Sequence, residues 1–123
     1  MFSHVMLGSN DLAKSKTFYD AIIVATGGKP GSYDPKGRLV YMNRGLVLLL
    51  SKPIDGKPAC GANGGTIGFA VDGPEQADAW HKAGAANGGT AIEDPPGPRD
   101  NLYLAYLRDP DGNKLCALHR IPA

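Results

Sequence analysis

Apolar positions recur with regular periods along this chain, and the period changes at clusters of glycine and proline. Residues 3–8 and 66–71 have the pattern of short strands, and each is followed by a segment whose apolar residues recur at helical spacing. Asp11 is a suitable N-cap for the first helix. The residues that fall on one face of this helix are Leu12, Ser15, Tyr19, Ile22 and Ile23.

The second helical segment begins near Pro74, a residue suited to a first helical turn, directly after Gly73. Its recurring small and apolar residues are Ala77, Trp80, Ala83 and Gly84. Both helical segments run into a Gly-Gly pair, at 27–28 and at 88–89, which favours a helix end there.

Strand patterns follow each helix. Residues 38–42 and 46–50 flank Asn43-Arg44-Gly45, which we interpret as a three-residue hairpin loop. Residues 103–108 and 114–119 flank the turn Asp109-Pro110-Asp111-Gly112. A shorter strand is expected before each hairpin, around 28–33 and 89–93. The two aspartates of the turn resemble a carboxylate pair, but turn chemistry explains both, since Asp starts turns by bonding the backbone ahead.

The two halves of the chain share one pattern of strand, helix and three strands. HVMLGSNDLAKSKTFYDAI, from His4, aligns with TIGFAVDGPEQADAWHKAG, from Thr66, so that Phe18 falls on Trp80. We therefore expect an α+β fold in one domain spanning 1–123. Its first module covers about 1–50, a Pro/Gly-rich linker 51–65 and its second module 66–123.

Composition narrows the class of protein. Hydrophobic residues make up 42% and charged residues 20% of the 123 residues, as in ordinary globular domains. The formal net charge is +1, and no basic stripe indicates a nucleic-acid partner. The longest apolar run is too short to span a bilayer, so no membrane partner is expected. No export signal is visible, and we expect a cytoplasmic protein with Cys60 and Cys116 as free thiols.

The tandem βαβββ order resembles the vicinal oxygen chelate superfamily, which contains glyoxalases, bleomycin-resistance proteins and dioxygenases. The segments that carry the resemblance are HVMLGSNDLAKSKTFYDAI, NGGTIGFAV and YLRDPDGNKLCALH. It implies two βαβββ modules that form a curved mixed sheet around a cleft, with the helices on the outside. It also implies that the chain forms a homodimer and binds a small organic ligand.

Metal-dependent members of that superfamily hold a divalent ion with side chains from four strands. His4 occupies the first of these positions, and Leu48 or Leu49 lies where the first half might supply a carboxylate. Thr66 stands where relatives have histidine, and Cys116 stands where they have glutamate. Only His4 is kept, and two possible ligands, His4 and the Cys116 thiolate, are too few for a catalytic ion. A dimer partner would carry the same replacements, so we predict no metal, with zinc, nickel or iron as the alternative.

The expected ligand-binding cleft is lined by His4, Met6, Thr66, Arg99, Tyr103 and Cys116. Tyr103 belongs to it if Cys116 pairs near Ala105 across the hairpin, because alternation places Tyr103 and Ala105 on one face. Arg38 and Arg99 could bind an anionic group at its rim or simply be solvated. His4 and Cys116 are the catalytic candidates, since a nearby histidine can activate a thiol. The alternative, which we favour for Cys116, is a small apolar residue buried in a strand.

Three functions follow, and we favour the first. It is a small-molecule-binding protein with a degenerate metal site. The second is a metal-dependent glyoxalase-like lyase or dioxygenase-like enzyme, and the third is a structural or partner-binding domain. The identity of the ligand cannot be read from the chain, because the loops decide the shape of the cleft.

Overall fold

The computed structural model describes residues 1–122, so the expected end of the second module at residue 123 lies outside the described part. The first half begins with strand β1 (His4–Gly8) and helix α1 (Leu12–Val24). Strands β2 (Ser32–Tyr33), β3 (Leu39–Asn43) and β4 (Leu46–Ser51) follow. The strand expected around 28–33 is present, but it is only two residues long.

The second half repeats this order and adds one strand. Strand β5 (Ile67–Ala70) and helix α2 (Pro74–Ala86) come first. The strands that follow are β6 (Thr90–Ala91), β7 (Gly97–Arg99), β8 (Leu102–Arg108) and β9 (Lys114–Arg120). The additional strand is β7, which pairs with β8; the proline-rich sequence around it gave no strand signal.

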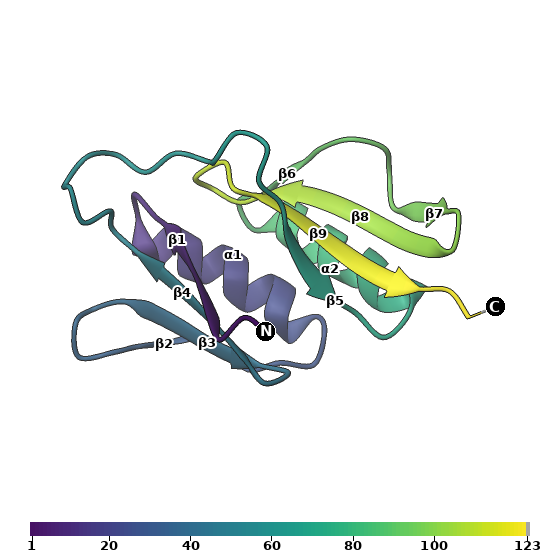
Figure 1. Ribbon diagram of the computed structural model, residues 1–123, viewed down its shortest axis with the longest axis horizontal. Helices are drawn as coiled ribbons and strands as arrows, with labels where there is room; N and C mark the ends of the chain where they lie inside the picture. Colours follow the sequence, from purple (N-terminus) through teal and green to yellow (C-terminus); the bar gives the residue numbers. More distant parts are fainter. Residues whose placement is uncertain (123) are drawn as a thin grey trace.

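The strands form two separate mixed sheets. The first has the order β1-β4-β3-β2, and the second has the order β5-β9-β8-β6, with β7 also paired to β8. The pairs β1–β4 and β5–β9 are parallel, and the others are antiparallel. The α+β class and its element order are confirmed, although the strands divide between two sheets. Figure 1 shows both helices behind the sheets. The faces of the two sheets that carry no helix, called their outer faces from here on, therefore point to the same side.

The helices join the two halves in one core. The buried residues of α1 are Ser15, Phe18, Tyr19, Ile22 and Ile23. This confirms the expected helical face apart from Leu12, which is only partly buried, and adds Phe18 to it. Asp11 caps this helix, because its Oδ1 accepts the backbone N–H groups of Ala13 and Lys14 at 3.1 and 3.2 Å. On α2 the buried residues are Ala77, Trp80 and Gly84. Among residues 1–122, neither helix is long and apolar enough to cross a membrane.

The first hairpin has a shorter loop than expected. Asn43 is in the strand and pairs with Leu46, so the loop consists of Arg44 and Gly45 alone. Their φ angles are +51° and +80°. Positive φ at both central residues is the geometry of the type I′ turn, which matches the twist of the flanking strands. The expectation of a three-residue loop was therefore wrong.

The aspartates of the turn at residues 109–112 accept backbone hydrogen bonds, as expected, and the turn also connects the two halves. Asp109 Oδ1 accepts the backbone N–H groups of Asp111 and Asn113, both at 2.9 Å. The Tyr19 hydroxyl of α1 donates to Asp109 Oδ2 at 2.5 Å. The backbone N–H of Asn10 donates to Asp111 Oδ1 at 2.9 Å. The turn is therefore tied to the beginning and the middle of α1.

Candidate functional site

The outer face of the first sheet carries His4. In the β1–β4 register His4 lies beside Val47, and Met6 lies beside Leu49. Since successive side chains alternate between faces, Leu49 shares the outer face with His4, while Leu48 faces the helices. His4 is exposed, and its Nδ1 lies 2.8 Å from Ser3 Oγ. The side chains around His4 on this face are therefore mostly apolar.

The outer face of the second sheet carries Cys116. Cys116 pairs with Gly68 on β5 and with Tyr106 on β8. The expected pairing of Cys116 near Ala105 was wrong by one residue, and such a slip exchanges the two faces of a strand. Tyr103 therefore lies on the helix side, where its hydroxyl donates to Asp78 Oδ1 of α2 at 2.7 Å. Tyr106 takes the place beside Cys116 that we expected for Tyr103.

The Cys116 thiol is buried and is not activated as a nucleophile. It is 5% exposed, and its Sγ lies 3.4 Å from the carbonyl oxygen of Ala117. Burial raises the pKa of this thiol, and this effect outweighs the lowering by the Tyr106 hydroxyl, Arg99 and Lys114. A thiol with a raised pKa is a poor nucleophile at neutral pH. This geometry favours the interpretation of Cys116 as a small buried residue.

Two cations flank the Tyr106 ring. Arg99 Cζ lies 5.5 Å and Lys114 Nζ 5.0 Å from the ring centroid, within the range of cation–π attraction. Lys114 forms an ion pair with Glu93, and Arg99 Nη2 lies 3.8 Å from Asp94 Oδ2. The positive charge on this face is therefore balanced by carboxylates.

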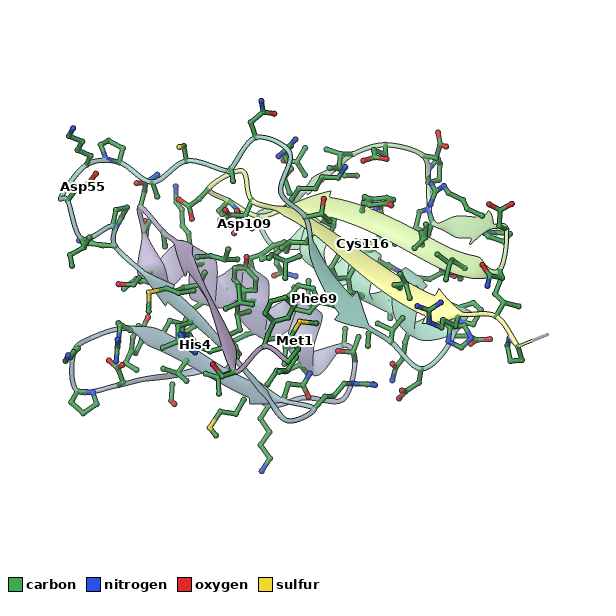
Figure 2. All side chains as sticks on the ribbon, viewed as in Figure 1. Met1, His4, Asp55, Phe69, Asp109 and Cys116 are labelled. Carbon is green, nitrogen blue, oxygen red and sulfur yellow. The ribbon has the colours of Figure 1, made fainter. Side chains whose placement is uncertain are left out.

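The structure distributes the expected cleft residues over both sheets. His4 and Met6 belong to β1, whereas Arg99 and Cys116 belong to β7 and β9, and exposed Thr66 directly precedes β5. Figure 2 shows His4 on the first sheet and Cys116 on the second. His4 is not among the groups that shift the pKa of Cys116. The structure does not bring these two side chains together as a histidine–thiol pair within one chain.

The residues at the positions where the sequence resemblance leads us to expect metal ligands do not fit a divalent ion. Leu49 has no donor atom, Thr66 offers only a neutral hydroxyl, and the raised pKa of Cys116 disfavours the thiolate that zinc requires. Within residues 1–122, no group of three or more His, Cys, Asp or Glu side chains is arranged to hold a metal ion. His4 alone supplies a good ligand at these positions.

A large hollow lies elsewhere, between the first sheet and the linker. It is an open groove of about 780 Å³. Met6, Gly8, Arg38 and Ser51 line it from the sheet side. The linker contributes residues 52–55 and 58–60, and Figure 2 shows Asp55 on this loop. Apart from Met6, none of these residues was in the expected cleft, although Arg38 was considered for its rim.

One sequence signal could have indicated this groove. The linker from 51 to 65 is longer than most connections in a compact domain, and long loops often form binding sites. Composition alone did not show that the loop folds back beside β1. That placement depends on Asn10, whose side chain accepts the N–H of Ala59 at 2.6 Å and donates to its carbonyl at 3.0 Å.

Comparisons with known proteins are consistent with this architecture. The family model described as Glyoxalase/Bleomycin resistance protein/Dioxygenase superfamily matches residues 1–117. A crystal structure of a glyoxalase/bleomycin resistance protein from Albidiferax ferrireducens T118 is 57% identical, with a TM-score of 0.93 and 98% of each chain covered. No curated protein matches this chain significantly.

Two fosfomycin resistance proteins named FosX share the fold at low identity. The one from Mesorhizobium loti has a TM-score of 0.72 and 14% identity, and the match covers 100% of this chain and 92% of that one. The one from Listeria monocytogenes has a TM-score of 0.72 and 17% identity, with 100% and 93% covered. Identities this low indicate a common fold and carry no information about the ligand.

Proposed function

This chain belongs to the Glyoxalase/Bleomycin resistance protein/Dioxygenase superfamily, and we propose that it is a small-molecule-binding protein that works without a bound metal ion. The observation that carries the proposal is the chemistry at the superfamily's metal positions. A catalytic ion needs about three protein ligands and open positions for the substrate. Here His4 stands with Leu49, Thr66 and a protected Cys116 thiol.

The groove beside the first sheet supports a binding role. Its volume of about 780 Å³ lies within the range of sites for small molecules. Its walls combine apolar side chains such as Met6 and Ile54 with a few charged groups such as Arg38. This mixture is typical of sites that recognise an organic ligand by shape and a small number of polar contacts.

Metal analysis of protein purified without chelators tests the metal-independent part of the proposal. We expect substoichiometric zinc, nickel and iron in the wild-type chain and the same result in His4→Ala. A thermal-shift screen of small organic ligands on this metal-free protein tests binding, because a ligand of the folded state raises Tm. We expect at least one ligand to raise it.

The contrary result is also clear. Stoichiometric metal that is lost in His4→Ala, together with Tm shifts that occur only when this metal is present, would overturn the proposal. It would favour a metal-dependent glyoxalase-like lyase or dioxygenase-like enzyme.

We also propose that the chain forms a homodimer through the outer face of its first sheet. On this face Met42, which does not line the groove, is 77% exposed although it is a large apolar residue. Val40, Val47 and Leu49 on the same face are only partly buried. A second copy covering this face would remove its apolar surface from water. Analytical ultracentrifugation of the wild-type chain tests this proposal.

A further inference from the structure

We propose that the groove between the first sheet and the linker binds a small organic anion with an apolar body. This inference rests on the proposed small-molecule-binding function and adds the place and the chemical class of the ligand. Three properties of the groove support it: a fixed wall, an excess of cations and exposed apolar side chains.

The linker wall is held in place by contacts with the segment before α1, with β1 and with the turn at 109–112. The Asn10 side chain accepts a hydrogen bond from the N–H of Ala59 and donates one to its carbonyl oxygen, which fixes both polar backbone groups of Ala59. Gly8 lies so close to this segment that a Cβ added to it would come within 2.9 Å of Ala59 Cβ. A Cβ on Gly61 would lie 2.2 Å from the Gly112 carbonyl oxygen, so the linker also packs on the turn at 109–112. A wall fixed in this way reduces the entropy that binding would otherwise cost.

The charged groups that line the groove are mainly cationic. They are Lys36, Arg38 and Lys52, with Asp55 as the single carboxylate, so their formal sum is three minus one, or +2. Arg38 Nε is paired with Asp34 Oδ2 at 2.6 Å, and counting this carboxylate leaves +1. No ion pair among residues 1–122 involves Lys36 or Lys52. These two ammonium groups are therefore available to an anionic ligand.

The second sheet offers a useful contrast. Its outer face also has two cations near an aromatic ring, but Lys114 is paired with Glu93 and Arg99 lies near Asp94. An anion arriving there would compete with carboxylates already in place. The two free lysines make the groove the better anion site of the two.

Apolar side chains complete the groove. Ile54 is fully exposed, and Met6 is nearly half exposed. Pro53 and Pro58 add rigid apolar surface to the linker wall. A ligand that covers these side chains gains free energy from the apolar area removed from water. An organic anion with an apolar body can pair with the lysines and also cover the apolar side chains. Inorganic phosphate could only pair with the lysines.

Two fluorescent probes with similar aromatic bodies test the inference. The probe 1-anilinonaphthalene-8-sulfonate carries a negative charge, and N-phenyl-1-naphthylamine lacks the sulfonate. We expect the double variant Lys36→Gln/Lys52→Gln to bind the sulfonate about tenfold more weakly and the neutral probe with unchanged affinity. Lys29→Gln/Lys82→Gln, at exposed lysines outside the groove, is the matched control and should bind both probes like the wild type.

Amide chemical-shift mapping locates the probes, because both could also bind exposed apolar surface elsewhere. The inference predicts that the sulfonate perturbs the amides of Gly8, Ser51 and Ala59. If both probes perturb them but the groove variant binds the sulfonate as tightly as the wild type, the anionic class is wrong and small-molecule binding stands. If neither probe perturbs them, the groove is the wrong site. A metal requirement for ligand binding would instead contradict the proposed function itself.

Discussion

At the residue scale, the two cysteines differ sharply in their surroundings. Cys116 is buried on β9 beside Tyr106, and burial raises the pKa of its thiol. Cys60 lies on the linker and is exposed. Reaction with a disulfide reagent requires both access and the thiolate form, and the burial of Cys116 limits access and raises the pKa of its thiol. The position at which the sequence resemblance leads us to expect a metal-binding glutamate therefore holds a thiol that we expect to be poorly reactive.

This contrast predicts two separate rates of modification by an aromatic disulfide reagent at neutral pH. We expect Cys60 to react at least about a hundredfold faster than Cys116 in the folded protein, because only Cys60 is accessible. Absorbance of the released thiolate measures both phases. Cys60→Ser should abolish the fast phase, and Cys116→Ser should abolish only the slow phase. A fast phase that survives in Cys60→Ser would show that Cys116 is reactive after all.

At the element scale, the crossing of α1 and α2 depends on Gly84. A Cβ at this position would lie 2.3 Å from Leu107 Cδ1 and 2.9 Å from Ile22 Cγ2. Both neighbours are completely buried, so neither can move aside into solvent. The small residue that helical spacing placed on the buried face of α2 is therefore needed for close packing of the helices.

Gly84→Ala tests this close approach because two effects have opposite signs. In an exposed helix interior alanine is more favourable than glycine by about 1 kcal/mol. Overpacking a filled core, by contrast, costs roughly 1–3 kcal/mol. We expect the free energy of unfolding to fall, as measured by urea denaturation. Ala79→Gly, at an exposed position of the same helix, measures the propensity effect alone. A stabilisation of Gly84→Ala equal in size to the loss in Ala79→Gly would contradict the packing argument.

Hairpin register is a second matter at this scale, and here the sequence was ambiguous. From the sequence we considered a pairing of Cys116 near Ala105, whereas Cys116 pairs with Tyr106. The Asp109 N–H donates to the Asn113 carbonyl at 2.9 Å, so the loop closes between these residues and Arg108 pairs with Lys114. This one-residue difference exchanges Tyr103 and Tyr106 between the faces of the sheet. The identity of the aromatic residue beside Cys116 could not be predicted without the loop geometry.

At the scale of the whole molecule, both sheets leave one face without a helix. A crevice of about 200 Å³, lined by Val5, Leu48, Ile67 and Phe69 among others, separates β1 from β5. The Arg44–Asp72 ion pair, at 2.9 Å, spans the two halves. The outer face of the first sheet is therefore accessible to a second copy of the chain, as the proposed homodimer requires.

Met42→Asp tests the proposed dimer. If the outer face of the first sheet is the interface, each copy loses a buried apolar side chain worth about 1.5 kcal/mol or more, and symmetry doubles the loss. The dissociation constant should rise about a hundredfold or more. Sedimentation equilibrium measures it. The control Ile54→Asp changes an exposed apolar residue on the linker and should leave the dimer intact; equal association of all three proteins would exclude this interface.

The sequence by itself determined the order of the elements apart from β7, the buried face of α1 and the identity of the side chains at the positions where the resemblance leads us to expect metal ligands. These are local properties, set by hydrophobic period, capping residues and the residue at each position. That the chain is one domain of two modules joined by a linker stays a prediction.

Only the tertiary structure decided which of these residues meet. It divided the strands into two sheets with His4 on one and Cys116 on the other, turned Tyr103 toward α2, and folded the linker into a groove beside β1. Each outcome depends on strand register or on contacts between distant segments, such as those of Asn10 with Ala59 and of Tyr19 with Asp109. Such contacts are chosen by the packing of the whole chain, and no local pattern specifies them.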